Sequence, residues 1–291
     1  MDQKQYAIYH ENKAHTALEF PYNTYPCSIP LDFYSVPTHW HNEMELIVIK
    51  KGEGIVYVDL KAYDVKANDI VILLPGQLHA IEQKDDFIME YENIFFKTDL
   101  LSSSSKDLCT SDFLQPLFQG RMTIPPVLTE YYSYHKDVTD CIAQIDILSG
   151  KRPLGYQLAI KGLLYQIFYY LVTNNTYKES CQNAKKSLDK MKTILTYIQE
   201  NYSRPITVDE MANECYYSKS HFMKFFKDSM GMGFIQYLNE YRLNVACQML
   251  RESSDSILNI AAMTGFDHLS YFNRIFKRKY GITPGEFRKL T

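Results

Sequence analysis

The chain has 291 residues, a formal net charge of -3 and 46% hydrophobic residues. This length suits two domains rather than one, and the composition excludes an intrinsically disordered chain. The longest near-apolar stretch, residues 162–172, is too short for a membrane span, so no membrane partner is expected. No signal-type leader opens the chain, and its six cysteines are scattered without a CxxC pair, which favours a cytoplasmic protein.

The first predicted structure is a β-barrel. From about residue 33 to residue 96, short β-rich runs such as MELIVIKKGEG alternate with turns. Runs of this length at roughly ten-residue spacing predict an antiparallel sandwich or barrel.

A group of histidines lies on this predicted barrel. His39, His41 and Glu45 form the pattern H-x-H-x3-E, and His79 follows later in PGQLH. If the first three residues lie on one strand, their side chains share a face. They can then hold one metal ion, with His79 as a fourth ligand.

These residues resemble the two cupin motifs. The first motif is complete over residues 39–52, except that Phe33 replaces its leading glycine, and in the second Asn68-Asp69 stands in place of Gly-Asp. The combination is similar to the sensor domain of AraC-type regulators. That resemblance implies a cupin barrel that binds a small effector such as a sugar, and in such sensors the histidine pattern often persists without a metal.

Two helices are predicted after the barrel, at residues 133–148 and 154–172. The second is strongly apolar, so it packs on the barrel, forms a dimer interface, or does both; the resemblance favours a homodimer. Its apolar residues are Ile160, Leu163, Leu164, Ile167, Phe168 and Leu171. The serine run at residues 102–105 is predicted to be a mobile loop, and the polar residues 174–187 to be a linker.

Charge divides at this linker. Residues 1–184 hold 15 basic and 23 acidic side chains, a balance of −8, whereas residues 185–291 hold 16 and 11, a balance of +5. An acidic first part and a basic second part indicate a nucleic-acid partner for the second.

The basic part contains an internal repeat. Apolar residues spaced i, i+3, i+4, i+7 predict a short helix, and the same spacing recurs 49 residues later. The offset then becomes 50, which predicts a turn one residue longer in the second copy. The repeated positions are Val208, Met211, Ala212 and Cys215 in the first copy and Ile257, Ile260, Ala261 and Thr264 in the second.

Capping residues agree with this repeat. Thr207 and Glu210 form a capping box at the first short helix. Ser218 and Asp267 are predicted to cap the longer helices, which Gly231 and Gly281 end. Gly265 suits a positive-φ turn in the second copy, whereas the first has Tyr216 there, a backbone strain of about 1 kcal/mol. One long helix, residues 234–253, joins the copies.

A short helix, a turn and a longer helix form the helix-turn-helix motif, whose second helix enters the major groove. Phe222, Phe226, Phe272 and Phe276 are predicted to face the core. Serine, asparagine, lysine and arginine on the opposite face can contact bases, and the other basic residues can contact phosphates. The predicted DNA-binding residues are Ser218, Lys219, Ser220, His221, Lys224, Lys227, His268, Ser270, Asn273, Arg274, Lys277 and Arg278.

Residues 188–291 resemble the DNA-binding domain of the AraC/XylS family of bacterial transcription regulators. The matching segments are SKSHFMKFFKDSMG, EYRLNVACQML and SILNIAAMTGFDHLSYFNRIFKRKYGITPGEFR. The resemblance implies seven helices, promoter DNA and RNA polymerase as partners, and activation as the commoner mode. It also places Ser220, Lys224, Ser270, Asn273 and Arg274 at base-contacting positions.

The expected fold class is therefore α+β with two domains: a cupin-like antiparallel β-barrel with helices for sensing and dimerisation (residues 1–173), and an all-α domain with two helix-turn-helix motifs (residues 188–291). The predicted function is a sequence-specific transcriptional regulator. Its effector residues are His39, Trp40, His41, Glu45, Tyr57 and His79. We expect no catalytic residue and no cofactor.

Two alternatives stay open. One is a metal-binding cupin enzyme with an accessory DNA-binding module, in which His39, His41, Glu45 and His79 hold the metal. The other is a barrel that only dimerises. Sixteen of the 24 tyrosines and the only tryptophan lie in residues 1–184, and tyrosine combines a stacking ring with a hydroxyl, as a sugar-like ligand requires.

Overall fold

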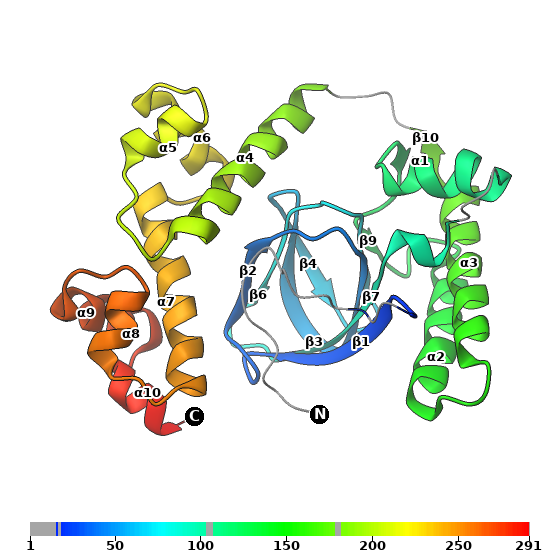
Figure 1. The fold of residues 1–291 in the computed structure, drawn as a ribbon. Coiled ribbons are helices and arrows are strands. Elements are labelled where there is room, and N and C mark those ends of the chain that lie inside the picture. Colours follow the sequence, from blue (N-terminus) through cyan, green and yellow to red (C-terminus); the bar gives the residue numbers. More distant parts are fainter. Residues whose placement is uncertain (1–15, 17–18, 103–106, 178–181, 291) are drawn as a thin grey trace. The chain divides into compact units, whose positions relative to one another are not determined.

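The computed structural model describes residue 16 and residues 19–102, 107–177 and 182–290 (Figure 1). Within these ranges the chain forms two compact units that divide at residues 182 and 183. The first unit is a β-barrel with helices and the second is helical. The predicted fold class is confirmed.

The barrel contains two sheets that share one long strand, β3 (Met44–Val58). One sheet has the order β1-β7-β3-β5-β9, and in the other β3 pairs with β4 and β6, and β6 with β2. All pairs are antiparallel. The remaining strands are β1 (Tyr22–Ile29), β2 (Ser35–His39), β4 (Lys61–Lys66), β5 (Ile70–Leu73), β6 (His79–Gln83), β7 (Met89–Phe96) and β9 (Val127–Leu128).

The sequence pattern did not predict two features of the barrel. Strand β1 precedes the predicted start of the barrel, and it contains Pro26, which is tolerated because β1 is an edge strand. Strand β3 passes from one sheet to the other at Gly52, with φ +75°, and a Cβ there would lie 1.7 Å from the carbonyl oxygen of Ile88. Only glycine fits this corner.

Each face of the barrel wall has its own apolar core. Alternate residues of β3 point to opposite faces: Ile47 and Ile49 pack inside the barrel, whereas Leu46 and Val48 pack with the helices outside. The inner core also holds Val71 and other buried side chains. The middle of the barrel is therefore filled by its own side chains.

Helices α2 (His135–Lys151) and α3 (Tyr156–Thr173) form an antiparallel pair on the outer face (Figure 1). The six apolar residues predicted for the second helix are all buried in the core that contains Leu46 and Val48. Packing on the barrel, one of the two roles left open, is thereby confirmed.

Shorter elements complete this unit. They are a 3₁₀ turn (Thr98–Leu100), a π-helical turn (Cys109–Leu114), α1 (Gln115–Phe118) and the paired strands β8 (Met122–Thr123) and β10 (Thr176–Tyr177). The predicted serine loop lies outside the described residues, apart from Ser102. Helix α4 begins at Gln182, so residues 182–187 of the expected linker are helical; the domain boundaries stay a prediction.

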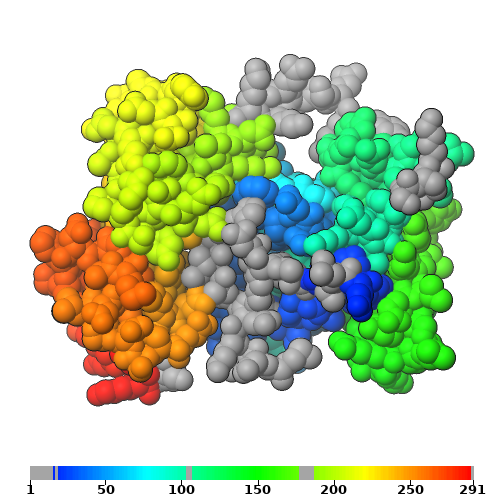
Figure 2. Space-filling model, viewed as in Figure 1, coloured from blue at the N-terminus to red at the C-terminus, as the bar shows by residue number. Residues whose placement is uncertain are grey.

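The described residues of the helical unit form the seven helices that the resemblance implied. They are α4 (Gln182–Asn201), α5 (Val208–Glu214), α6 (Lys219–Met230), α7 (Phe234–Glu252), α8 (Ile257–Met263), α9 (Leu269–Tyr280) and α10 (Pro284–Leu290). Figure 2 shows the surface of this unit from one side, with α8 and α9 in orange and α10 in red. Across the described parts of both units, no helix combines the length and apolarity that crossing a membrane would need.

The duplicated helix-turn-helix is confirmed in detail. In each copy a helix of 7 residues precedes one of 12, and the turn has four residues in the first copy and five in the second. Gly231 and Gly281 end the longer helices with positive φ. The Asp267 cap was wrong: His268 is the N-cap of α9, without a side-chain cap bond, because the extra turn residue shifts the helix start by one position.

Candidate functional site

The two longer helices of the repeat each bury one face and expose the other. Phe222 and Phe226 in α6, and Phe272 and Phe276 in α9, are completely buried, as predicted. Because 3.6 residues complete a helical turn, their burial turns the intervening polar residues outward. Each helix thus presents a polar face on a rigid apolar base.

The predicted DNA-binding residues lie on these outward faces. All are exposed except Asn273, which is half-buried. Ser218 uses its hydroxyl to cap α6, accepting a hydrogen bond from the amide of His221 at 3.3 Å. Lys219 forms an ion pair of 2.7 Å with Asp209 of α5. Their contacts with DNA stay predictions.

Arg274 is supported by residues that the sequence pattern missed. Its guanidinium carbon lies 5.3 Å from the ring centre of Tyr271, one helical turn earlier. The Tyr271 hydroxyl accepts a hydrogen bond from Asn239 of α7 at 3.1 Å. A held ring limits the freedom of the arginine above it, which lowers the entropy cost of a base contact. The i, i+3 spacing of Tyr271 and Arg274 is the signal that predicts this pair.

A second polar network orders the start of α5. Thr207 and Glu210 form the predicted capping box. Arg204 donates a hydrogen bond of 2.6 Å to the Glu210 carboxylate, and Tyr197 donates another. These contacts, the one from Arg204 first, lower the pKa of Glu210 to about 2. The capping carboxylate is thus charged at neutral pH.

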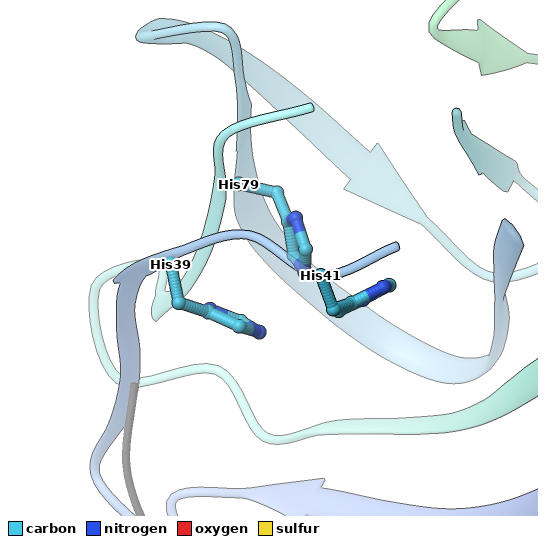
Figure 3. A group of neighbouring side chains, drawn as sticks. All are labelled: His39, His41 and His79. Carbon is cyan, nitrogen blue, oxygen red and sulfur yellow. The ribbon is translucent and has the colours of Figure 1, made fainter. Parts of the chain in front are cut away.

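The histidines predicted on the barrel do converge (Figure 3). His39, His41 and His79 each offer a ring nitrogen, and these atoms lie within 4.8 Å of one another. The expected reason was wrong, because His39 ends β2, His41 lies in the following turn and Glu45 lies on β3. Antiparallel pairing of β2 with β6 brings His79 opposite His39.

Each of the three imidazoles donates a hydrogen bond from Nδ1 to a main-chain carbonyl two residues away. His39 donates to Pro37 at 2.9 Å, His41 to Glu43 at 3.2 Å and His79 to Gln77 at 3.0 Å. A carbonyl oxygen can only accept, so Nδ1 carries the proton in each ring. The Nε2 atoms are then the ones available to one another, to a ligand or to a metal.

Glu45 lies among these Nε2 atoms. One of its carboxylate oxygens is 3.0 Å from Nε2 of His41 and 3.1 Å from Nε2 of His79. Burial opposes ionisation of Glu45, but the two histidines hold its pKa well below the usual range. Burial, and then the charges of His79 and His41, lower the pKa of His39 well below 6.5.

The other two predicted effector residues are Trp40 and Tyr57. Trp40 is half-buried in the turn between His39 and His41. Tyr57 neighbours the Val58–His79 pair in register, so its side chain points to the opposite face from His79. It donates a hydrogen bond of 3.1 Å to Glu82. The structure therefore does not bring Tyr57 to the histidines.

Asn93 joins the site instead. It lies opposite Ile47, on the same face of β7 as Phe95, the partner of Glu45 in register. Oδ1 of Asn93 is one of the buried polar atoms that have no hydrogen-bond partner among the described residues. The signal for Asn93 in the sequence is a polar residue next to the apolar end of strand β7. A separate hollow of about 460 Å³, near Gly52 and His135, is lined by none of the six predicted effector residues.

The two units match two known kinds of domain. Residues 30–168 match the model of the AraC-like ligand binding domain, and residues 211–290 match that of a helix-turn-helix domain. The chain belongs to the AraC family of transcriptional regulators. This AraC-family regulator therefore combines a ligand-binding domain with a DNA-binding domain.

Relatives share this organisation along most of their length. The AraC-family regulator is 23% identical over 277 residues to the uncharacterized HTH-type transcriptional regulator YdeC of Bacillus subtilis, covering 95% of this chain and 94% of that one. It is 21% identical over 261 residues to the HTH-type transcriptional activator RhaS of Escherichia coli, covering 87% of each. Among solved structures, ToxT from Vibrio cholerae is 16% identical and covers 92% of this chain and 98% of its own, with a TM-score of 0.48.

Proposed function

We propose that this regulator is a cytoplasmic activator that binds promoter DNA through α6 and α9 and responds to a small polar molecule, such as a sugar, at the histidine end of its barrel. The observation that carries the effector site is the set of buried polar groups, His41, Glu45, His79 and Asn93, beside the apolar inner core of the barrel. A buried polar atom without a partner, here Oδ1 of Asn93, favours a ligand that supplies one. The name of the relative RhaS as an activator supports activation, which requires a contact with RNA polymerase.

In this proposal Ser220, Lys224, Ser270, Asn273 and Arg274 contact bases. Lysine and arginine can bind guanine, and asparagine can bind adenine. Lys227, Lys277 and Arg278 contact phosphates, which set the position on DNA without reading its sequence.

We further propose that α3 pairs with its copy in a homodimer. Its inner face is buried, but Leu158, Tyr165 and Tyr169, spaced i, i+7, i+11, are exposed along its outer face, and Leu158 is 77% exposed. A regular apolar stripe of this kind favours a partner helix.

Leu158→Glu and Tyr169→Glu are each expected to convert the dimer into a monomer of 34.0 kDa. The reason is that a charge buried in an apolar interface costs several kcal/mol. Sedimentation velocity at micromolar concentration measures this. Ile147→Glu on α2, a residue 56% exposed, is the matched control and stays dimeric. A monomeric wild type contradicts the proposal.

The second candidate is the metal-binding barrel, and the three imidazoles favour it. In a neutral imidazole with Nδ1 protonated, Nε2 carries a lone pair, and the Nε2 atoms of His41 and His79 face a carboxylate oxygen of Glu45. A nitrogen lone pair and a carboxylate oxygen at these distances repel each other unless a cation lies between them, and this cation is either a proton or a metal ion. The donor set, with Nδ1 of each ring bound to a carbonyl, fits a divalent transition metal held by His39, His41, His79 and Glu45. Such an ion would supply Lewis-acid chemistry.

One experiment separates the two candidates. Wild-type protein purified without added metal is analysed for its metal content, and its thermal unfolding is followed with a panel of monosaccharides. The effector proposal expects one sugar to raise the unfolding temperature, since a ligand of the native state stabilises it, and His79→Ala to abolish that rise.

The control is His135→Ala, which removes an imidazole that bonds the carbonyl of Asn68, outside the cluster. It should keep the sugar response. About one metal ion per chain in the wild type and none in His79→Ala would establish the metal candidate instead. If the wild type shows no sugar response and contains no metal, both candidates are wrong, and the alternative of a barrel that only dimerises is left.

A further inference from the structure

Helix α7 is shared by both helix-turn-helix copies. In its first half, the rings of Phe234 and Tyr237 pack on Phe226 of α6, with centres 5.5 Å apart in both cases. In its second half, Leu243 and Leu250 belong to the core of the second copy. The two reading helices are thus attached to opposite halves of one helix.

Arg242 lies between these halves and contacts both copies. It is only 8% exposed. Its Nε donates a hydrogen bond of 2.8 Å to the carbonyl of Tyr202, and its Nη2 donates one of 2.7 Å to that of Arg204, both in the segment that leads into α5. Its guanidinium carbon is 5.7 Å from the ring centre of Phe266, in the turn of the second copy.

The turn of the second copy lies directly on these groups. Gly265 has φ +82°, and a Cβ there would lie 2.3 Å from the Tyr202 carbonyl oxygen and 2.9 Å from Nε of Arg242. The matching residue of the first copy, Tyr216, also has positive φ, but its side chain is 93% exposed. The copies therefore differ for a physical reason: a side chain at Gly265 would meet Tyr202 and Arg242, whereas the side chain of Tyr216 lies in solvent.

The contact continues into the first motif. The side chain of Arg204, whose carbonyl Arg242 binds, holds the Glu210 carboxylate that caps α5. A chain of hydrogen bonds and packing thus joins the turn before α9 to the first helix of the other motif. Lysine has no planar fork with which to serve both carbonyls.

We infer that Arg242 is a positioning residue: with Gly265 it fixes α9 relative to α6 and so determines the spacing of the two DNA segments that the regulator reads. This rests on the proposed function, in which both helices enter the major groove. A rigid joint demands one spacing, because each added base pair rotates the second segment by about 35° around the DNA axis.

The test measures affinity against spacing. Full-length wild type selects its binding sequence from random DNA, and one base pair is then inserted between the two contacted segments. The insertion is expected to weaken binding of the wild type at least about 10-fold. It should weaken binding of Arg242→Met less than about 3-fold, because α9 can then change its position relative to α6. The quantity compared is the ratio of the affinities for the original and the lengthened site. If Arg242 only stabilised the fold, its replacement would lower the unfolding temperature without changing this ratio.

Gly265→Ala provides a second variant that keeps Arg242. It should also lose less than about 3-fold in affinity when the base pair is inserted. Its matched control is Gly281→Ala, which has the same kind of backbone, with φ +76°, but no atom within 4 Å of its Cβ. That control should keep the wild-type ratio. The inference is overturned if the wild type tolerates the insertion, or if folded Arg242→Met or Gly265→Ala keeps the wild-type ratio. Failure of the wild type to select any sequence would instead contradict the proposed function.

Discussion

Arg274→Ala is expected to weaken binding to the selected operator about 10- to 100-fold, since a good bidentate base contact contributes about 1–3 kcal/mol of discrimination. Binding to random DNA should change less than about 3-fold. The guanidinium is exposed on α9 and stacked on Tyr271, which holds it ready for a base. Fluorescence anisotropy with labelled operator and random duplexes at two salt concentrations measures both affinities.

The matched variant is Lys277→Ala on the same helix. As a phosphate contact, Lys277 should contribute equally on both duplexes, and its removal should reduce the salt dependence of binding by about one counterion. Equal losses on operator and random DNA for Arg274→Ala would contradict base reading by this residue.

Phe276→Ala is expected to lower the free energy of unfolding of the helical unit by about 3–5 kcal/mol, as for other large-to-small changes in a core. Its ring is fully buried, with ring centres of Tyr280 and Phe287 at 4.7 and 5.6 Å. Specific DNA binding should fall with it, because the outward face of α9 depends on this inner face.

The two units allow this loss to be assigned. The only tryptophan, Trp40, lies in the barrel unit, so its fluorescence reports the barrel, whereas far-ultraviolet circular dichroism reports mainly helices. In urea, Phe276→Ala should move the helical transition and leave the fluorescence transition in place. Leu258 in α8 is 58% exposed. Leu258→Ala should change the free energy of unfolding obtained from either transition by less than about 0.5 kcal/mol. An equal shift of both signals would mean that the units do not unfold separately.

Local order in the helical unit was predictable almost residue by residue. The repeat, the two turn lengths, the capping box at Thr207 and the glycine ends of α6 and α9 all follow from interactions within about four residues. The failure at Asp267 is also local: a capping residue type does not by itself determine where a helix begins, and the extra turn residue moved the start of α9 to His268.

The barrel was predictable in kind but not in detail. The edge strand β1 lacks a clear alternation, and its pairing with β7 joins residues about seventy positions apart. Tyr57 was assigned to the effector site because of its residue type, whereas strand register turned it away from His79. Asn93 was missed because only register shows that its position faces inward.

The sequence by itself determined that this protein has an acidic first part and a basic second part, that the second is a duplicated helix-turn-helix, and that the family is AraC, because periodicity, caps and motifs are local properties of the chain. Only the tertiary structure decided which nitrogens of His41 and His79 face Glu45, which side of α3 is left exposed, and why Gly265 cannot have the side chain that Tyr216 has. Those outcomes depend on contacts between residues far apart in the chain, which strand register and helix packing alone establish.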